Sequence, residues 1–108
     1  MLSSQERIEN TTESYVYLVK EMNQGNVKIG RSKDIRDRLQ TFNVKLPFKI
    51  ELLHTIFCED YVFSEKILHN HFDDLRVDGE WFSLAEKDIN EIKNDQFIRS
   101  LGINIKPI

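Results

Sequence analysis

The chain has 108 residues, of which 40% are hydrophobic, and its formal net charge at pH 7 is −3. This length suits one compact domain, because small domains bury only about two thirds of the surface that their unfolded chains expose. The single cysteine excludes an internal disulfide. No apolar run approaches the roughly 20 residues of a membrane helix, and the start lacks the apolar middle of a secretion signal, so we expect a cytoplasmic protein without a membrane partner.

The basic residues are gathered in one stretch of the chain. Residues 28–38 contain five basic side chains and two acidic ones, a local net charge of +3. Residues 59–95 contain eleven acidic and four basic side chains, a local net charge of −7. Because charge patterning indicates where an anionic partner is attracted, a phosphate-bearing ligand should prefer the first stretch.

The first predicted elements form a hairpin. Residues 1–14 are polar and lack periodicity, and we interpret them as a flexible arm. Residues 15–19 and 27–30 are β-rich runs separated by a polar, glycine-containing segment. This pattern predicts two antiparallel strands joined by a turn.

A helix and a third strand are predicted next. Ser32 can cap a helix that ends before Pro47, since the residue before proline avoids helical geometry. Its apolar stripe consists of Ile35, Leu39 and Phe42. The run at residues 50–57 is long and apolar enough to be a central third strand.

Helical spacing dominates the rest of the chain. Apolar residues recur at this spacing from about residue 60 to 72, and an S-x-x-E capping box at residues 83–86 predicts another helix after the turn-like segment RVDGE. We interpret residues 95–108 as a C-terminal tail. The domain at residues 15–94 therefore has the order β-β-α-β-α-α, a mixed α/β (α+β) fold with a small three-stranded antiparallel sheet flanked by helices.

Four side chains in this plan suit phosphodiester chemistry. Tyr17 and Lys28 lie on paired strands, Arg38 in the helix that follows, and Glu65 in the next helix. Cutting a phosphodiester requires an activated oxygen nucleophile, positive charge beside the phosphorus and help for the departing oxygen. A phenol, two cations and a metal-binding carboxylate would meet these needs.

The order of the short motifs resembles the GIY-YIG nuclease superfamily. The matching residues are Tyr15-Val16-Tyr17, Lys28-Ile29-Gly30, Arg38, the ExxLHxxF motif (Glu65, Leu68, His69 and Phe72) and GEWF (Gly79 to Phe82). More narrowly, the chain is similar to a phage and bacterial branch that has KIG in place of YIG and a C-terminal GEWF motif. Tyr15 departs from the superfamily name, which has glycine there, and Lys28 takes the place of its second tyrosine.

This resemblance implies a role for each matched residue. Tyr17 would be the general base or water-orienting phenol with Lys28 as its neighbouring cation, and Arg38 would brace the phosphate. Glu65 would bind one Mg²⁺ (or Mn²⁺), and His69 would touch the metal's waters or protonate the leaving oxygen.

Each of these residues also has an ordinary structural interpretation. Tyr17 would then be a half-buried strand aromatic and Arg38 an ion-pair partner of Asp34, while Glu65 would be a solvated helix residue. His69 would pack under Trp81.

Further basic residues would contact the nucleic acid backbone, or else form an ordinary solvated helix face. They are Arg31, Lys33, Arg36 and Lys45. Gly30 would allow a close approach of the backbone to substrate or helix. Glu80, Trp81 and Phe82 would lock the last helix onto the sheet rather than react.

The leading hypothesis is a metal-dependent endonuclease that hydrolyses phosphodiester bonds in DNA by attack of water. The first alternative is a nucleic-acid-binding module of the same fold without cleavage, and the second is a protein-interaction domain. Because a chain of this size has no room for a separate DNA-reading domain, sequence selectivity would come from a targeting partner, a homodimer or the N-terminal arm.

Overall fold

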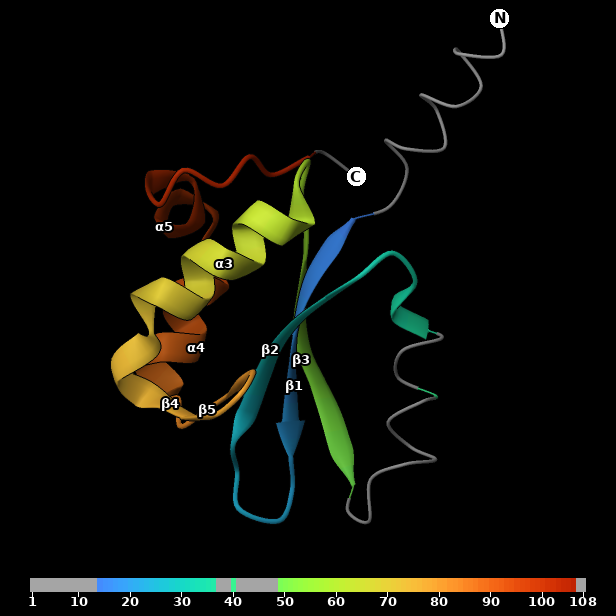
Figure 1. The fold of residues 1–108 in the computed structure, drawn as a ribbon, viewed down its shortest axis with the longest axis vertical. Helices are drawn as coiled ribbons and strands as arrows, with labels where there is room; N and C mark the ends of the chain where they lie inside the picture. Colours follow the sequence, from blue (N-terminus) through green and yellow to red (C-terminus); the bar gives the residue numbers. More distant parts are fainter. Residues whose placement is uncertain (1–13, 37–39, 41–48, 107–108) are drawn as a thin grey trace, which may run out of the picture.

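The computed structural model describes residues 14–36, 40 and 49–106 (Figure 1). The strands are β1 (Tyr15–Glu21), β2 (Val27–Ser32), β3 (Ile50–Phe57), β4 (Arg76–Asp78) and β5 (Trp81–Phe82). The helices are α3 (Tyr61–His71), the 3₁₀ turn η1 (Asp73–Leu75), α4 (Glu86–Ile92) and α5 (Asp95–Ser100).

The strands form one antiparallel sheet in the order β3-β1-β2-β5-β4. The mixed α+β class and the β1–β2 hairpin are confirmed, but the prediction of a three-stranded sheet with the order β-β-α-β-α-α is wrong. The two strands that it missed, β4 and β5, have three and two residues, which is too few to show the alternation of a strand. The segment RVDGE, expected to be a turn only, supplies β4 and the positive-φ Gly79 that leads to β5.

The third strand also occupies a different place from the one expected. β1 pairs with both β2 and β3, with Tyr15 opposite Ser32 on one side and opposite Phe57 on the other. Among the described strands β3 pairs with β1 alone, so it lies at the edge of the sheet and not at its centre. Its mixed burial pattern agrees with an edge position.

Helices α3, α4 and α5 lie on one side of the sheet and cover the main core (Figure 1). Alternate residues of β1 and β2 face this core, among them Leu18 and Ile29, which meet Leu68 of α3 and Ile98 of α5. A fully buried side chain of this size contributes about 1.5–3 kcal/mol. The intervening residues of β1, Tyr17 and Val19, belong to a second cluster with Ile35 and Ile50.

Local capping fixes where the helices begin. Asp60 caps α3 by accepting a hydrogen bond from the N–H of Phe63 at 3.0 Å, as the predicted start near residue 60 requires. The N-cap of α4 is Ala85, whose N–H donates to Oδ2 of Asp88 at 2.8 Å, so the predicted Ser83 cap is wrong by two residues. α5 lies within the residues interpreted as a tail, and its Ile98 is fully buried.

One buried carboxylate holds the turn between β1 and β2. Glu21 is only 6% exposed, and its side chain accepts hydrogen bonds from the backbone N–H groups of the turn. The donors are Asn23, Gln24 and Gly25 to Oε1 at 2.8, 2.6 and 3.2 Å, and Asn26 to Oε2 at 3.3 Å. Burial alone would raise the pKa of Glu21, but these hydrogen bonds outweigh it and lower the pKa below the ordinary value.

Two predicted segments fall largely outside the described residues. Nearly all of the N-terminal arm, residues 1–13, does so, and the predicted helix after Ser32 is described only at Ile35, Arg36 and Gln40, which are helical. Ser32 Oγ accepts a hydrogen bond from the N–H of Asp34 at 2.9 Å. Within the part of the chain that the structure covers, no helix is both long and apolar enough to cross a membrane.

Candidate functional site

The candidate site lies next to the N-terminal end of the short strand β5. β5 pairs with β2 only at Val27 and Lys28. The next residue of β2, Ile29, donates its N–H to the carbonyl of Glu80 at 2.9 Å, and its own carbonyl lies 2.7 Å from Nε2 of His69. A carbonyl oxygen can only accept, so Nε2 of His69 carries the proton. His69 thus bonds the Ile29 carbonyl of β2 at the position that follows its last ladder pair with β5.

His69 therefore links α3 to the sheet at the rim of the site. Its ring centroid lies 5.1 Å from that of Phe82, rather than under Trp81 as the structural interpretation expected. With Nε2 bonded to Ile29, the nitrogen that is left for a ligand or a water is Nδ1.

The side chain of Tyr17 in β1 lies over β2 at the position of a glycine. Tyr17 and Gly30 are direct partners in the β1–β2 ladder. A Cβ atom at Gly30 would lie less than 3.0 Å from the phenol oxygen and Cζ of Tyr17. The phenol thus rests on the backbone of Gly30, so a larger residue there would displace the Tyr17 ring.

Lys28 lies beside Glu80, a carboxylate that the sequence pattern had assigned to packing. Nζ of Lys28 is 3.6 Å from Oε1 of Glu80, and the side chains are 19% and 44% exposed. Glu80 precedes Trp81, the ladder partner of Lys28, so the β4–β5 hairpin carries this carboxylate to the pocket.

Glu65 is the most deeply buried charged side chain of the group. It is 6% exposed, and its Oε1 accepts a hydrogen bond from Nη1 of Arg31 at 2.7 Å. Its Oε2 is also buried and has no hydrogen-bond partner among the described residues. Arg31 is 43% exposed, and its guanidinium lies 5.7 Å from the ring centroid of Tyr61. Sequence reasoning expected Arg31 to contact nucleic acid and did not anticipate this pair.

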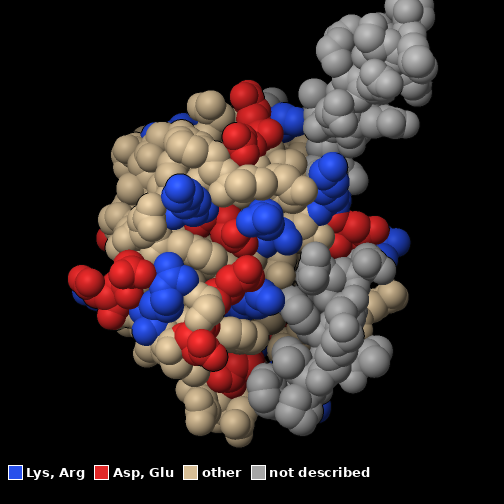
Figure 2. All heavy atoms as spheres, viewed as in Figure 1, with Lys and Arg blue, Asp and Glu red and all other residues tan. Residues whose placement is uncertain are grey.

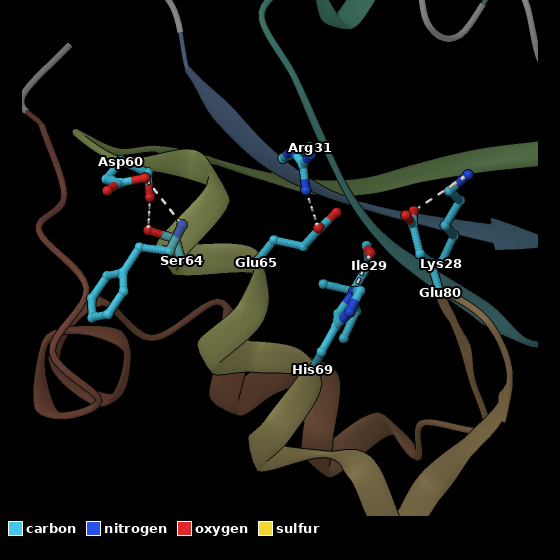
Figure 3. A network of polar contacts seen from close by, with 9 residues as sticks. Lys28, Ile29, Arg31, Asp60, Ser64, Glu65, His69 and Glu80 are labelled. Carbon is cyan, nitrogen blue, oxygen red and sulfur yellow. Dashed lines mark hydrogen bonds and ion pairs between the residues drawn. The ribbon is translucent and has the colours of Figure 1, made fainter.

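These side chains surround one small open pocket of about 180 Å³. Figure 3 shows Arg31 and Glu65 pointing toward each other, Lys28 and Glu80 doing the same, and His69 directed at Ile29. The lining residues are Tyr17, Lys28, Arg31, Glu65 and Glu80. The structure therefore brings together three of the predicted catalytic residues, Tyr17, Lys28 and Glu65, from β1, β2 and α3.

The other predicted site residues lie elsewhere or outside the described part. Arg38 and Lys45 fall outside the described residues. Lys33 and Arg36 are exposed and line a separate, larger hollow of about 480 Å³ with Tyr15 and Thr55. We place the site in the smaller pocket because it combines a phenol, two cations and a buried carboxylate.

The donor atoms of the pocket fit a single divalent ion held mainly by solvent and substrate. Among the described residues, no group of three or more His, Cys, Asp and Glu side chains could hold a metal. Magnesium is commonly bound by one or two carboxylates, with waters and substrate phosphates completing its shell. Oε2 of Glu65, buried and lacking a hydrogen-bond partner among these residues, is the atom that fits such an ion.

The surface seen in Figure 2 is mixed in charge. Among the described residues on this face, basic side chains are interspersed with acidic ones and form no continuous basic patch. This pattern agrees with the net charge of −3 and with the cations of the pocket, each of which lies beside a carboxylate.

Comparison with known proteins gives one family match. Residues 14–97 match the family described as "T5orf172 domain", a span that includes every residue lining the pocket. No curated protein and no solved structure gives a significant match.

Proposed function

The chain belongs to the T5orf172 domain family, and on this premise we propose that it is a metal-dependent endonuclease that hydrolyses phosphodiester bonds in DNA by attack of water. The family is associated with nuclease-like proteins of phages and bacteria. The GIY-YIG resemblance of the KIG, ExxLHxxF and GEWF motifs supports the finer assignment.

The observation that carries the proposal is the shared pocket of Tyr17, Lys28 and Glu65. These residues are far apart in the sequence and lie on three different elements, yet they line one hollow. Such a combination of a potential base, a cation and a buried carboxylate is the arrangement that phosphodiester hydrolysis needs.

The residues of this chain divide the chemistry among them. Tyr17 orients and deprotonates the attacking water, with its phenol held in place by contact with Gly30. Lys28 and Arg31 supply positive charge to the scissile phosphate. Glu65 would hold a divalent ion through Oε2, and when bound this ion supplies charge for the phosphate and the departing oxygen. His69 positions β2 through Ile29.

Nicking of supercoiled plasmid DNA tests the proposal. Purified protein with Mg²⁺ or Mn²⁺ should convert supercoiled plasmid to the open circle, and both Tyr17→Phe and Glu65→Gln should abolish this conversion. Glu91→Gln, which changes an exposed glutamate of α4, is the matched control and should nick like the wild type. Nicking that persists in Glu65→Gln would rule out the assigned site.

A DNA-binding module without cleavage is the second candidate function, favoured by the ion pairs of the pocket. Lys28 lies beside Glu80 and Arg31 beside Glu65, so the four charges sum to zero in the free protein. This function predicts salt-sensitive DNA binding, no nicking with any divalent ion, and no effect of Tyr17→Phe on binding.

A further inference from the structure

In the ion pair between Arg31 and Glu65, the glutamate side chain is buried and the arginine side chain is partly exposed. The Glu65 side chain is 7% exposed and comes from the middle of α3, whereas the Arg31 side chain is 43% exposed near the end of β2. The Arg31 side chain can therefore turn toward solvent, while the carboxylate stays in the pocket.

The pair also leaves Glu65 only partly satisfied. A buried carboxylate needs a compensating charge, and Arg31 supplies it to Oε1 at 2.7 Å. An arginine fork can bond both oxygens of a carboxylate, but Oε2 has no partner among the described residues. The pocket thus holds one carboxylate oxygen in a charge-assisted hydrogen bond and keeps the other available to a second cation.

The neighbouring pair of Lys28 and Glu80 is looser. Its atoms are 3.6 Å apart and Glu80 is 44% exposed, so solvent already screens it. The Arg31–Glu65 pair, which is shorter and holds a buried carboxylate, is consequently the stronger of the two contacts. Moving Arg31 away would leave the buried Glu65 carboxylate without a compensating charge unless another cation took its place.

We propose that Arg31 is an internal substitute for the divalent ion. In the free protein it compensates Glu65, and when a divalent ion binds Glu65, Arg31 turns to the substrate phosphate. This inference rests on the proposed function, because it concerns the same pocket. Since coupling between two ligands is reciprocal, DNA tightens divalent-ion binding and the ion tightens DNA binding.

Calorimetric titration with Mn²⁺ in the absence of DNA tests the exchange. Arg31→Gln should bind Mn²⁺ at least about fivefold more tightly than the wild type, which is the lower end of typical coupling between sites. Lys66→Gln is the matched control, because Lys66 follows Glu65 on α3, is exposed and carries the same charge. Its Mn²⁺ affinity should change much less.

The converse measurement uses a short DNA duplex. In the wild type, saturating Mn²⁺ should tighten binding of the duplex, and in Arg31→Gln this enhancement should shrink. If Arg31→Gln does not fold, Arg31→Lys provides the test, since it keeps the charge but bonds Glu65 through a single flexible ammonium and should bind Mn²⁺ with intermediate affinity.

The outcomes separate the two proposals. Mn²⁺ affinity that is equal to or weaker than that of the wild type in a folded Arg31→Gln protein overturns the exchange. If Glu65→Gln binds Mn²⁺ as well as the wild type, the metal site of the proposed function fails as well. If Glu65→Gln loses Mn²⁺ and Arg31→Gln does not gain affinity, only the exchange is overturned.

Discussion

Two glutamates of this molecule are equally buried but accept different numbers of hydrogen bonds. One lies in the β1–β2 turn and the other in the pocket at α3. Glu21 and Glu65 are each 6% exposed. Glu21 accepts hydrogen bonds from four backbone N–H groups of one turn, whereas Glu65 accepts one from Arg31 and keeps a buried oxygen without a partner among the described residues.

If Glu65 holds the ion that we propose, the number of hydrogen bonds that a buried acid accepts distinguishes a structural role from a binding role better than its burial does. A fully bonded carboxylate stabilises the fold that it belongs to. A half-bonded one carries a desolvation cost that a ligand can relieve. The two glutamates should therefore respond to the same isosteric change, glutamate to glutamine, in opposite ways.

The largest expected effect is on activity at Glu65. Glu65→Gln should lower plasmid nicking by at least about a hundredfold, because even outer partners of a metal site contribute about 10–100-fold. Its thermal stability should stay close to that of the wild type, since the change also removes a buried charge. Gel quantification of nicking rates and a melting curve check both statements, and a nicking rate within a few-fold of the wild type would contradict the first.

Glu21→Gln should show the reverse pattern. Losing the charge that several N–H groups share should lower the free energy of unfolding by about 1–2 kcal/mol. The nicking rate per folded molecule should not change, because Glu21 does not line the pocket. Urea titration measures the first quantity, with Glu91→Gln as a surface control; equal midpoints for both variants would remove the contrast.

At low pH, the wild type and Glu21→Gln should have similar free energies of unfolding. Its folded pKa lies below the ordinary value of 4.5, so the stabilisation is fully present above 4.5 and is lost as the pH falls through the folded pKa. The gap in unfolding free energy between the wild type and Glu21→Gln should thus narrow on acidification. Urea midpoints of both proteins along a pH series provide the measurement.

A smaller effect is expected at His54, which lies in neither carboxylate region. Burial lowers the pKa of His54 below 6.5, and the positive charge of Lys93 lowers it further, while Asp95 opposes them. The unfolded chain therefore binds a proton more readily, and stability should fall as the pH drops through 6.5. His54→Gln should show a flatter dependence in this window, and an unchanged slope would exclude His54 as its source.

The sequence predicted those parts of the fold that local patterns determine. The hairpin, the strand at Ile50–Phe57 and the helix at Tyr61–His71 have clear periodicity and, for α3, a capping Asp60. β4 and β5 escaped prediction because strands of three and two residues form only through pairing with each other and with β2. The edge position of β3 likewise depends on which strand β1 accepts on its second side.

The sequence singled out three of the residues that line the candidate pocket as catalytic, but not the contacts between them. The motifs pointed to Tyr17, Lys28 and Glu65, which line one pocket. The contact between Arg31 and Glu65 joins residues 34 positions apart and has no local signature. Glu80 was assigned to packing together with its aromatic neighbours in GEWF. Glu21 was overlooked because the polar EMNQGN segment was interpreted only as a turn. Both acids act through contacts that only the folded backbone creates.

The brevity of β5 limits how domains of this shape can vary. Because β5 begins only at Trp81 and pairs with only Val27 and Lys28, the carbonyl of Ile29 bonds to His69 and not to a further residue of β5. One further rung in the β4–β5 hairpin would extend the sheet along Gly30 and seal the rim of the site. A relative with a longer hairpin would keep the same topology and cover the proposed site, so hairpin length would distinguish relatives with an open pocket from those without one.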